Sequence, residues 1–140
     1  MRFAIVVGRF YEELADRLVT SARELFEEAT DEPVDVFAVP GAFELPLAAL
    51  TLAESGRYDG IACLGAVIRG ETSHYDYVCS EAARGIADVM LRTGVPCGFG
   101  VLTVENMEQA LARTRGGKRD QGEHAAFAVL ALARLRAQFT

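Results

Sequence analysis

Residues 59–68 read DGIACLGAVI, a run that is apolar at consecutive positions rather than at every second one. A strand with this pattern is buried on both faces, as in the centre of a parallel sheet that helices cover. Three other short runs are also apolar or β-branched, namely 3–8 (FAIVVG), 34–39 (VDVFAV) and 97–104 (CGFGVLTV). We therefore expect four strands, with residues 59–68 inside their sheet.

Helical patterns separate the four strands. Apolar residues recur at intervals of three and four from Leu14 to Ala29, with charged residues on the opposite side. Further helices are expected after Pro40-Gly41 as far as Gly56, from Tyr75 to Gly94, over Glu105–Arg113 and over His124–Gln138. Strands and helices that alternate in this way form a three-layer α/β/α sandwich with a four-stranded parallel sheet. A chain of 140 residues without linkers or repeats indicates one domain, residues 1–140.

Charge and composition exclude several functions. The chain has 14 Lys and Arg against 20 Asp and Glu, a net charge of −6, which gives no reason to bind nucleic acid or an anionic membrane. No apolar run is long enough to span a bilayer, and the short run before Gly8 indicates a strand rather than a signal peptide. The three cysteines and two histidines have no metal-binding spacing. We expect inert thiols, no metal, and a reducing compartment, the cytoplasm.

The last expected helix is apolar nearly all round. Residues 124–135, HAAFAVLALARL, contain one formal charge, Arg134. A helix that covers one face of a sheet normally has a polar outer side, so close packing against a second subunit is the simplest explanation. The alternative is an alanine-rich helix on the surface, since alanine tolerates water well.

Aromatic residues lie at or near the expected ends of several strands. No dinucleotide fingerprint, P-loop or nucleophile-elbow motif is present. Ligands of open α/β sheets bind beyond the carboxyl ends of the strands, where this sequence has Phe10 and, in PGAFELP (40–46), Phe43 with Glu44. Phe99 lies in the fourth strand between two glycines. One such ring can equally be core packing, but three favour a site for a flat heterocycle.

Two segments suit an anion. Gly70-Glu71-Thr72-Ser73 precedes a helix, where main-chain N–H groups, a hydroxyl and the helix dipole favour negative charge. The alternative is a simple helix cap by Thr72 or Ser73. The second segment is a basic cluster, which is either a phosphate contact or a solvated loop: Arg113, Arg115, Lys118 and Arg119. His74, next to the first segment, is either a proton shuttle or an ordinary surface histidine.

These motifs, in this order, resemble the 6,7-dimethyl-8-ribityllumazine synthase family. The matching segments span most of the chain: GRF (8–10), PGAFELP (40–46), GAVIRGETSHYDYV (65–78), FGVLT (99–103) and ENMEQALAR (105–113). The resemblance implies a flavodoxin-like sandwich of the lumazine synthase type. It also implies condensation of 5-amino-6-(D-ribitylamino)uracil with 3,4-dihydroxy-2-butanone 4-phosphate, the penultimate step of riboflavin biosynthesis, without metal or cofactor.

The resemblance also implies roles for individual residues. Phe10 would stack on the pyrimidine, and His74 would move protons. The other implied contacts are Ala42, Phe43 and Glu44 for the ribityl side, Ala66, Val67 and Ile68 for the uracil edge, and Glu71, Thr72 and Arg113 for the phosphate. Phe99 and Arg113 would come from a neighbouring subunit, because the family's sites lie between the subunits of a pentamer.

Three positions depart from the family's pattern. Tyr11 stands where the family has asparagine, Gln121 replaces a lysine of many bacterial members, and His124 replaces a glutamate. The chain also starts at its first strand, without the extension that many members lay across a neighbour. Two rival functions therefore remain open. The first is a non-catalytic flavin-binding or assembly protein on the same scaffold, and the second is a flavodoxin-like binding module, which the missing phosphate loop after the first strand disfavours.

Overall fold

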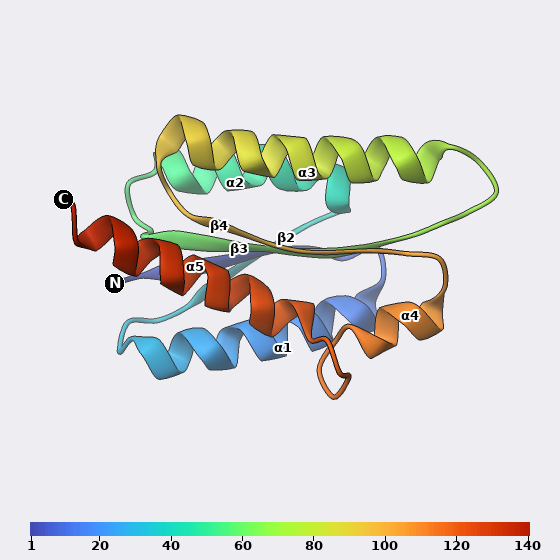
Figure 1. Ribbon diagram of the computed structural model, residues 1–140, viewed down its shortest axis with the longest axis horizontal. Helices are drawn as coiled ribbons and strands as arrows, with labels where there is room; N and C mark the ends of the chain where they lie inside the picture. The colour runs from blue at the N-terminus through green and yellow to red at the C-terminus, as the bar shows by residue number, and fades with distance from the viewer.

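The computed structural model describes residues 1–140 (Figure 1). Its strands are β1 (Phe3–Gly8), β2 (Asp35–Val39), β3 (Gly60–Ile68) and β4 (Cys97–Val104). Its helices are α1 (Glu12–Ala29), α2 (Leu45–Glu54), α3 (His74–Thr93), α4 (Met107–Ala112) and α5 (Gln121–Ala137), and a short 3-10 turn, η1 (Ala42–Glu44), precedes α2. All the expected strands and helices are present.

The four strands form one sheet in the order β2-β1-β3-β4, and each neighbouring pair is parallel. β3 lies inside the sheet, and its residues 60–65 are buried. Helices α2 and α3 cover one face, while α1, α4 and α5 lie on the other (Figure 1). The prediction of a three-layer α/β/α sandwich with a four-stranded parallel sheet is therefore confirmed.

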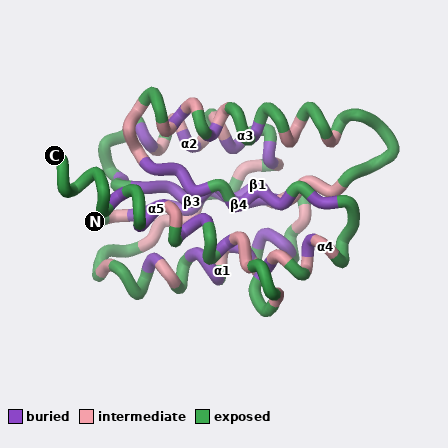
Figure 2. The backbone as a smooth tube through the Cα atoms, viewed as in Figure 1, coloured by how far each residue is buried: buried purple, intermediate pink, exposed green.

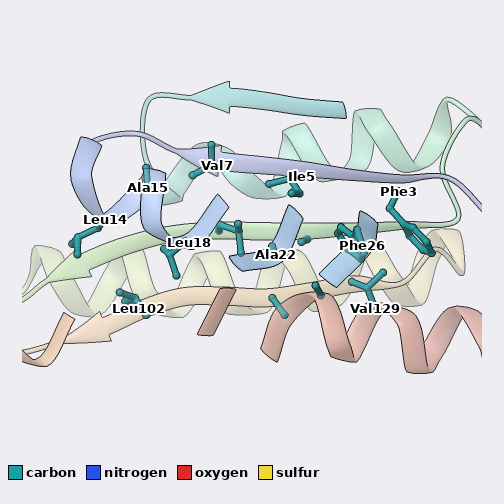
Figure 3. Packing of buried hydrophobic residues seen from close by; sticks show 14 of the residues in the cluster. Phe3, Ile5, Val7, Leu14, Ala15, Leu18, Ala22, Phe26, Leu102 and Val129 are labelled. Carbon is teal, nitrogen blue, oxygen red and sulfur yellow. The ribbon is translucent and has the colours of Figure 1, made fainter. Parts of the chain in front are cut away.

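Two hydrophobic cores lie on the two faces of this sheet, because successive side chains of a strand point to opposite faces. Phe3, Ile5 and Val7 of β1 pack with α1 and α5, where the ring of Phe3 stacks on that of Phe26 at 4.7 Å (Figure 3). The intervening residues of β1 pack with α2 and α3. Buried residues accordingly follow β1, β3 and β4, whereas the residues of the edge strand β2 are intermediate or exposed, and many exposed residues lie on the outer sides of the helices and in loops (Figure 2).

Helix α5 packs unusually close to the sheet. A Cβ atom at Gly98 would lie 2.2 Å from the carbonyl oxygen of Ala125, and one at Gly60 would lie 2.2 Å from a methyl group of Val129. Glycines on the strands and alanines on the helix therefore permit this contact. The outer side of α5 is also apolar, since Phe127 is 62% and Leu135 51% exposed.

The main differences from the sequence prediction lie at helix ends. The last helix begins at Gln121 rather than His124, because the Asp120 carboxylate accepts hydrogen bonds from the N–H groups of Gly122 and Glu123 and caps it there. The short helix begins at Met107, where Asn106 is the cap. No helix of the structure combines the length and the apolar character that crossing a membrane requires.

Candidate active site

A cavity of about 750 Å3 opens at the carboxyl ends of β1 and β3. In Figure 1, the loop between β3 and α3 projects beyond the sheet at this end. Ten of the fifteen residues around the cavity are hydrophobic. The residues are Phe10, Tyr11, Gly41, Ala42, Phe43, Glu44, Ala66, Val67, Ile68, Gly70, Thr72, His74, Tyr75, Tyr77 and Val78.

Aromatic rings form much of the cavity wall. Phe10 and Phe43 are 75% and 59% exposed, although both are large apolar side chains. They lie at one mouth because β1 approaches the η1 segment so closely that a Cβ atom at Gly8 would be 2.8 Å from the main chain of Gly41. Exposed aromatic faces beside an apolar cavity favour a flat ligand.

One edge of β3 is open toward the cavity. Pairing of β3 with β1 ends at Leu64, whereas pairing with β4 continues to Ile68. Ala66, Val67 and Ile68 therefore have a partner strand on one side only. Main-chain donors and acceptors on an unpaired strand edge can bind the polar edge of a ligand. This arrangement results from the unequal lengths of β1 and β3.

The carboxylate of Glu44 also lines the cavity, and a main-chain contact holds it in place. Its Oε1 atom accepts a hydrogen bond from the main-chain N–H of Gly41 at 2.9 Å. This contact closes the short turn that carries Ala42 and Phe43 into the cavity wall. The Oε2 atom forms no hydrogen bond in the structure, and it can accept one from a ligand hydroxyl.

Thr72 and His74 lie where α3 begins. The Thr72 hydroxyl accepts a hydrogen bond from the main-chain N–H of His74 at 3.3 Å, and the cap residue Ser73 makes no side-chain cap bond. Thr72 thus has the local helix-start role that was the alternative in the sequence analysis, and it also lines the cavity. The His74 side chain is exposed at the cavity rather than buried in a core.

Three predicted site residues lie outside this cavity: Glu71, Phe99 and Arg113. Phe99 is on the edge strand β4 and is 37% exposed. Arg113 follows α4, and its guanidinium donates a hydrogen bond to the carbonyl oxygen of Gln109 at 3.0 Å. Glu71 lies between two residues that do line the cavity, Gly70 and Thr72, whereas one chain alone does not bring Phe99 and Arg113 to the other predicted contacts.

The other three residues of the basic cluster have two different surroundings. Arg115 forms an ion pair with Glu24 of α1, and this pairing raises the pKa of its guanidinium. Arg115 therefore has a structural partner within the chain. Lys118 and Arg119 instead line a second, open hollow of about 460 Å3, together with Gln121 and His124. That hollow has a single hydrophobic wall residue, in contrast to the aromatic cavity.

The sequence analysis missed several cavity residues. Tyr75, Tyr77 and Val78 fall in the helix that was expected from Tyr75 to Gly94, without a role in the site, yet all three line the cavity. Their position could have indicated this. Residues in the first turns of a helix that begins at the carboxyl end of a strand lie at the end of the sheet where ligands bind. Partial burial raises the pKa of the Tyr75 hydroxyl, which lies beside the thiol of Cys79. No group of three or more His, Cys, Asp or Glu side chains is arranged to hold a metal ion.

A doubly wound parallel sheet with an aromatic cavity at its carboxyl end defines the class of α/β proteins that bind a small molecule at that edge. A family model described as 6,7-dimethyl-8-ribityllumazine synthase matches residues 1–137. A 6,7-dimethyl-8-ribityllumazine synthase from Desulfatibacillum aliphaticivorans is 46% identical over 140 residues, which cover 99% of this chain and 90% of that relative. The chain belongs to the 6,7-dimethyl-8-ribityllumazine synthase family, and it is an enzyme, a transferase of riboflavin biosynthesis. Neither comparison supports the non-catalytic alternative.

Proposed function

We propose that the aromatic cavity binds 5-amino-6-(D-ribitylamino)uracil and 3,4-dihydroxy-2-butanone 4-phosphate and condenses them to 6,7-dimethyl-8-ribityllumazine. Two carbon–nitrogen bonds form, and phosphate and water leave. The observation that carries this proposal is the convergence of Phe10, Glu44 and His74 on one cavity beside the open edge of β3. These residues come from three separate segments of the family motif.

The pyrimidine occupies the side of the cavity near β1. The exposed ring of Phe10 offers a flat apolar face, and stacking of a base on such a ring contributes about 1–3 kcal/mol. The open edge of β3, at Ala66, Val67 and Ile68, offers main-chain groups to the carbonyl and N–H groups of the uracil. The ribityl chain then extends toward Ala42, Phe43 and Glu44, where a carboxylate can accept hydrogen bonds from its hydroxyl groups.

The phosphate substrate occupies the side near the start of α3. That helix has 20 residues, and its N-terminal main-chain groups and dipole favour an anion. Glu71 and Thr72 hold the phosphate there through the loop they occupy, and Arg113 of a neighbouring subunit neutralises it. His74 removes a proton from the attacking amine and returns one to the departing oxygen. The residues position two groups that already react with each other, so neither a metal nor a cofactor is required.

A homopentamer, or a multiple of it, completes this site. Phe99 and Arg113 lie outside the cavity of their own chain, and both are accessible to a neighbour. The outer side of α5 carries exposed apolar residues, which a second subunit would cover. The three cysteines are unpaired, as in proteins of the cytoplasm, where we place this enzyme.

The proposed reaction is tested by turnover. Purified protein is mixed with both substrates, and lumazine fluorescence and inorganic phosphate are followed together. We expect both products to appear in equal amounts, and only when both substrates are present. Phosphate release without fluorescence, or no reaction at all, would contradict the proposed reaction.

A further inference from the structure

Arg69, the residue directly after β3, connects three elements at the edge of the proposed site. Its main-chain N–H donates a hydrogen bond to the carbonyl oxygen of Val104 at 2.9 Å, so the β3–β4 ladder continues by one further contact. Its Nε atom lies 2.8 Å from a carboxylate oxygen of Glu105, just after β4. A terminal guanidinium nitrogen lies 3.4 Å from the carboxylate of Asp76 on α3.

The same guanidinium also stacks on an aromatic ring. Its carbon lies 4.3 Å from the centre of the Tyr75 ring, which is within the range of a cation–π contact. The Tyr75 hydroxyl lies beside the side chain of Thr103 on β4, and Tyr75 itself lines the cavity. Arg69 and Tyr75 therefore join the first turn of α3 to the ends of β3 and β4.

The segment between Arg69 and α3 has few other attachments. In Gly70–Ser73, the Thr72 hydroxyl accepts from the N–H of His74, and the Ser73 carbonyl accepts from the first turn of α3. All of these hydrogen bonds stay within the segment and its own helix. A Cβ atom at Gly70 would meet nothing within 4 Å. The position of this segment relative to the sheet therefore depends on its two ends, and Arg69 holds both.

We propose that Arg69 is a positioning residue, which sets the place of Thr72 and His74 relative to the open edge of β3 by bridging Glu105, Asp76 and the Tyr75 ring. This role rests on the proposed function, since it assigns the phosphate and proton-transfer groups to the segment that Arg69 fixes. Arg69 does not line the cavity, so it acts through other residues.

Arginine suits this role better than lysine does. A guanidinium is planar, donates in several directions at once and stacks on a ring, whereas an ammonium group is a compact point charge. Each exposed ion pair contributes little to stability. Geometry at a reacting centre is more sensitive, because a displacement of about 1 Å can cost about 100-fold in rate. Loss of Arg69 is thus expected to affect turnover much more than folding.

The test compares Arg69→Ala and Arg69→Lys with Arg84→Ala as a matched control. Arg84 also forms an ion pair with a carboxylate on α3, that of Glu81, but lies outside the cavity. Four quantities are measured: the Kd for the uracil substrate alone, the KM for the butanone phosphate, kcat, and the melting temperature. Glu105→Gln, which removes one bridge and leaves the arginine, serves as a second variant if Arg69→Ala does not fold.

For Arg69→Ala we expect kcat/KM for the butanone phosphate to fall about 10- to 100-fold. The Kd for the uracil substrate should change less than about threefold, Arg69→Lys should be intermediate, and Arg84→Ala should match the wild type. Unchanged kinetics in Arg69→Ala would overturn the positioning role. So would an equal loss of uracil binding and of thermal stability, since that pattern indicates a general structural role. If instead the wild type forms no lumazine, the proposed function itself fails.

Discussion

Phe10 and Tyr11 form an edge-to-face pair at the mouth of the cavity, with ring centres 4.9 Å apart and ring planes at 77°. Tyr11 also packs against the hydrophobic core on the α1 side, whereas Phe10 projects into solvent. The half-buried ring therefore supports the exposed one. Such a pair contributes about 0.5–1.5 kcal/mol beyond the area it buries, which helps to orient Phe10 before a ligand arrives.

Phe10→Ala should weaken binding of the uracil substrate by about 1–3 kcal/mol, because an aromatic stack on the base is lost. Calorimetric titration of each ligand alone measures this. Binding of inorganic phosphate should be little changed in the same variant. An equal loss for both ligands would show that Phe10 supports the fold of the site rather than the pyrimidine.

His74→Ala should lower kcat about 100- to 10,000-fold, since a general acid–base group is removed. Substrate affinity should be largely kept, and positioning of the two reactants should leave some residual activity. Steady-state kinetics over pH 6–8 should also show a flatter profile, because the group that moves protons is absent. Full kcat across the range would mean that His74 is only the first residue of α3.

Arg113→Ala should raise the KM for the butanone phosphate about 10- to 150-fold, which corresponds to about 1.5–3 kcal/mol for a charge-assisted contact. Arg115→Ala is the matched control, because Arg115 is already paired with Glu24. Initial rates at saturating uracil substrate distinguish the two. Similar increases in both variants would assign the effect to the general charge of the loop.

Asp35 should make the stability depend on pH in the acid range. The Tyr58 hydroxyl donates to the Asp35 carboxylate at 2.7 Å and holds the pKa of that carboxyl below its usual value, and Arg2 pairs with it at 3.0 Å. A lowered folded-state pKa gives stability above the unfolded pKa of about 4, and this stability is lost as the pH falls through the folded value. Melting curves of Asp35→Asn should therefore show a lower Tm at pH 7 and a smaller decrease toward pH 3. Wild-type pH dependence in the variant would contradict this assignment.

The exposed apolar side of α5 and the position of Arg113 outside the cavity predict an oligomer, and the family resemblance implies a homopentamer or a multiple of it. Light scattering should give a mass of about 75 kDa or a multiple, from chains of 15.1 kDa. A mass of about 15 kDa at micromolar concentration would contradict the shared site.

The sheet and its layers could be predicted because short apolar runs alternate with helical patterns along the whole chain. DGIACLGAVI is apolar on both faces, which is typical of an inner strand of a parallel sheet that helices cover, and helical patterns flank it on both sides. The cavity wall at Phe10, Phe43 and Glu44 could be located in the same way, since these residues follow strand ends. The role of Tyr75 and Val78 could not, because an apolar stripe on a helix is equally consistent with core packing and with a cavity wall. The ion pair of Arg69 with Glu105 joins residues far apart in sequence, and it depends on the register of β3 against β4, in which Ile68 lies opposite Val104.

The account depends most on where the pyrimidine binds, and a crystal structure with bound lumazine product tests this directly. We predict that the product ring lies on the Phe10 ring, with its polar edge within hydrogen-bond distance of the main chain at Ala66–Ile68 and its ribityl chain toward Glu44. A product bound instead in the hollow at Lys118, Gln121 and His124, with the aromatic cavity empty, would contradict the assignment.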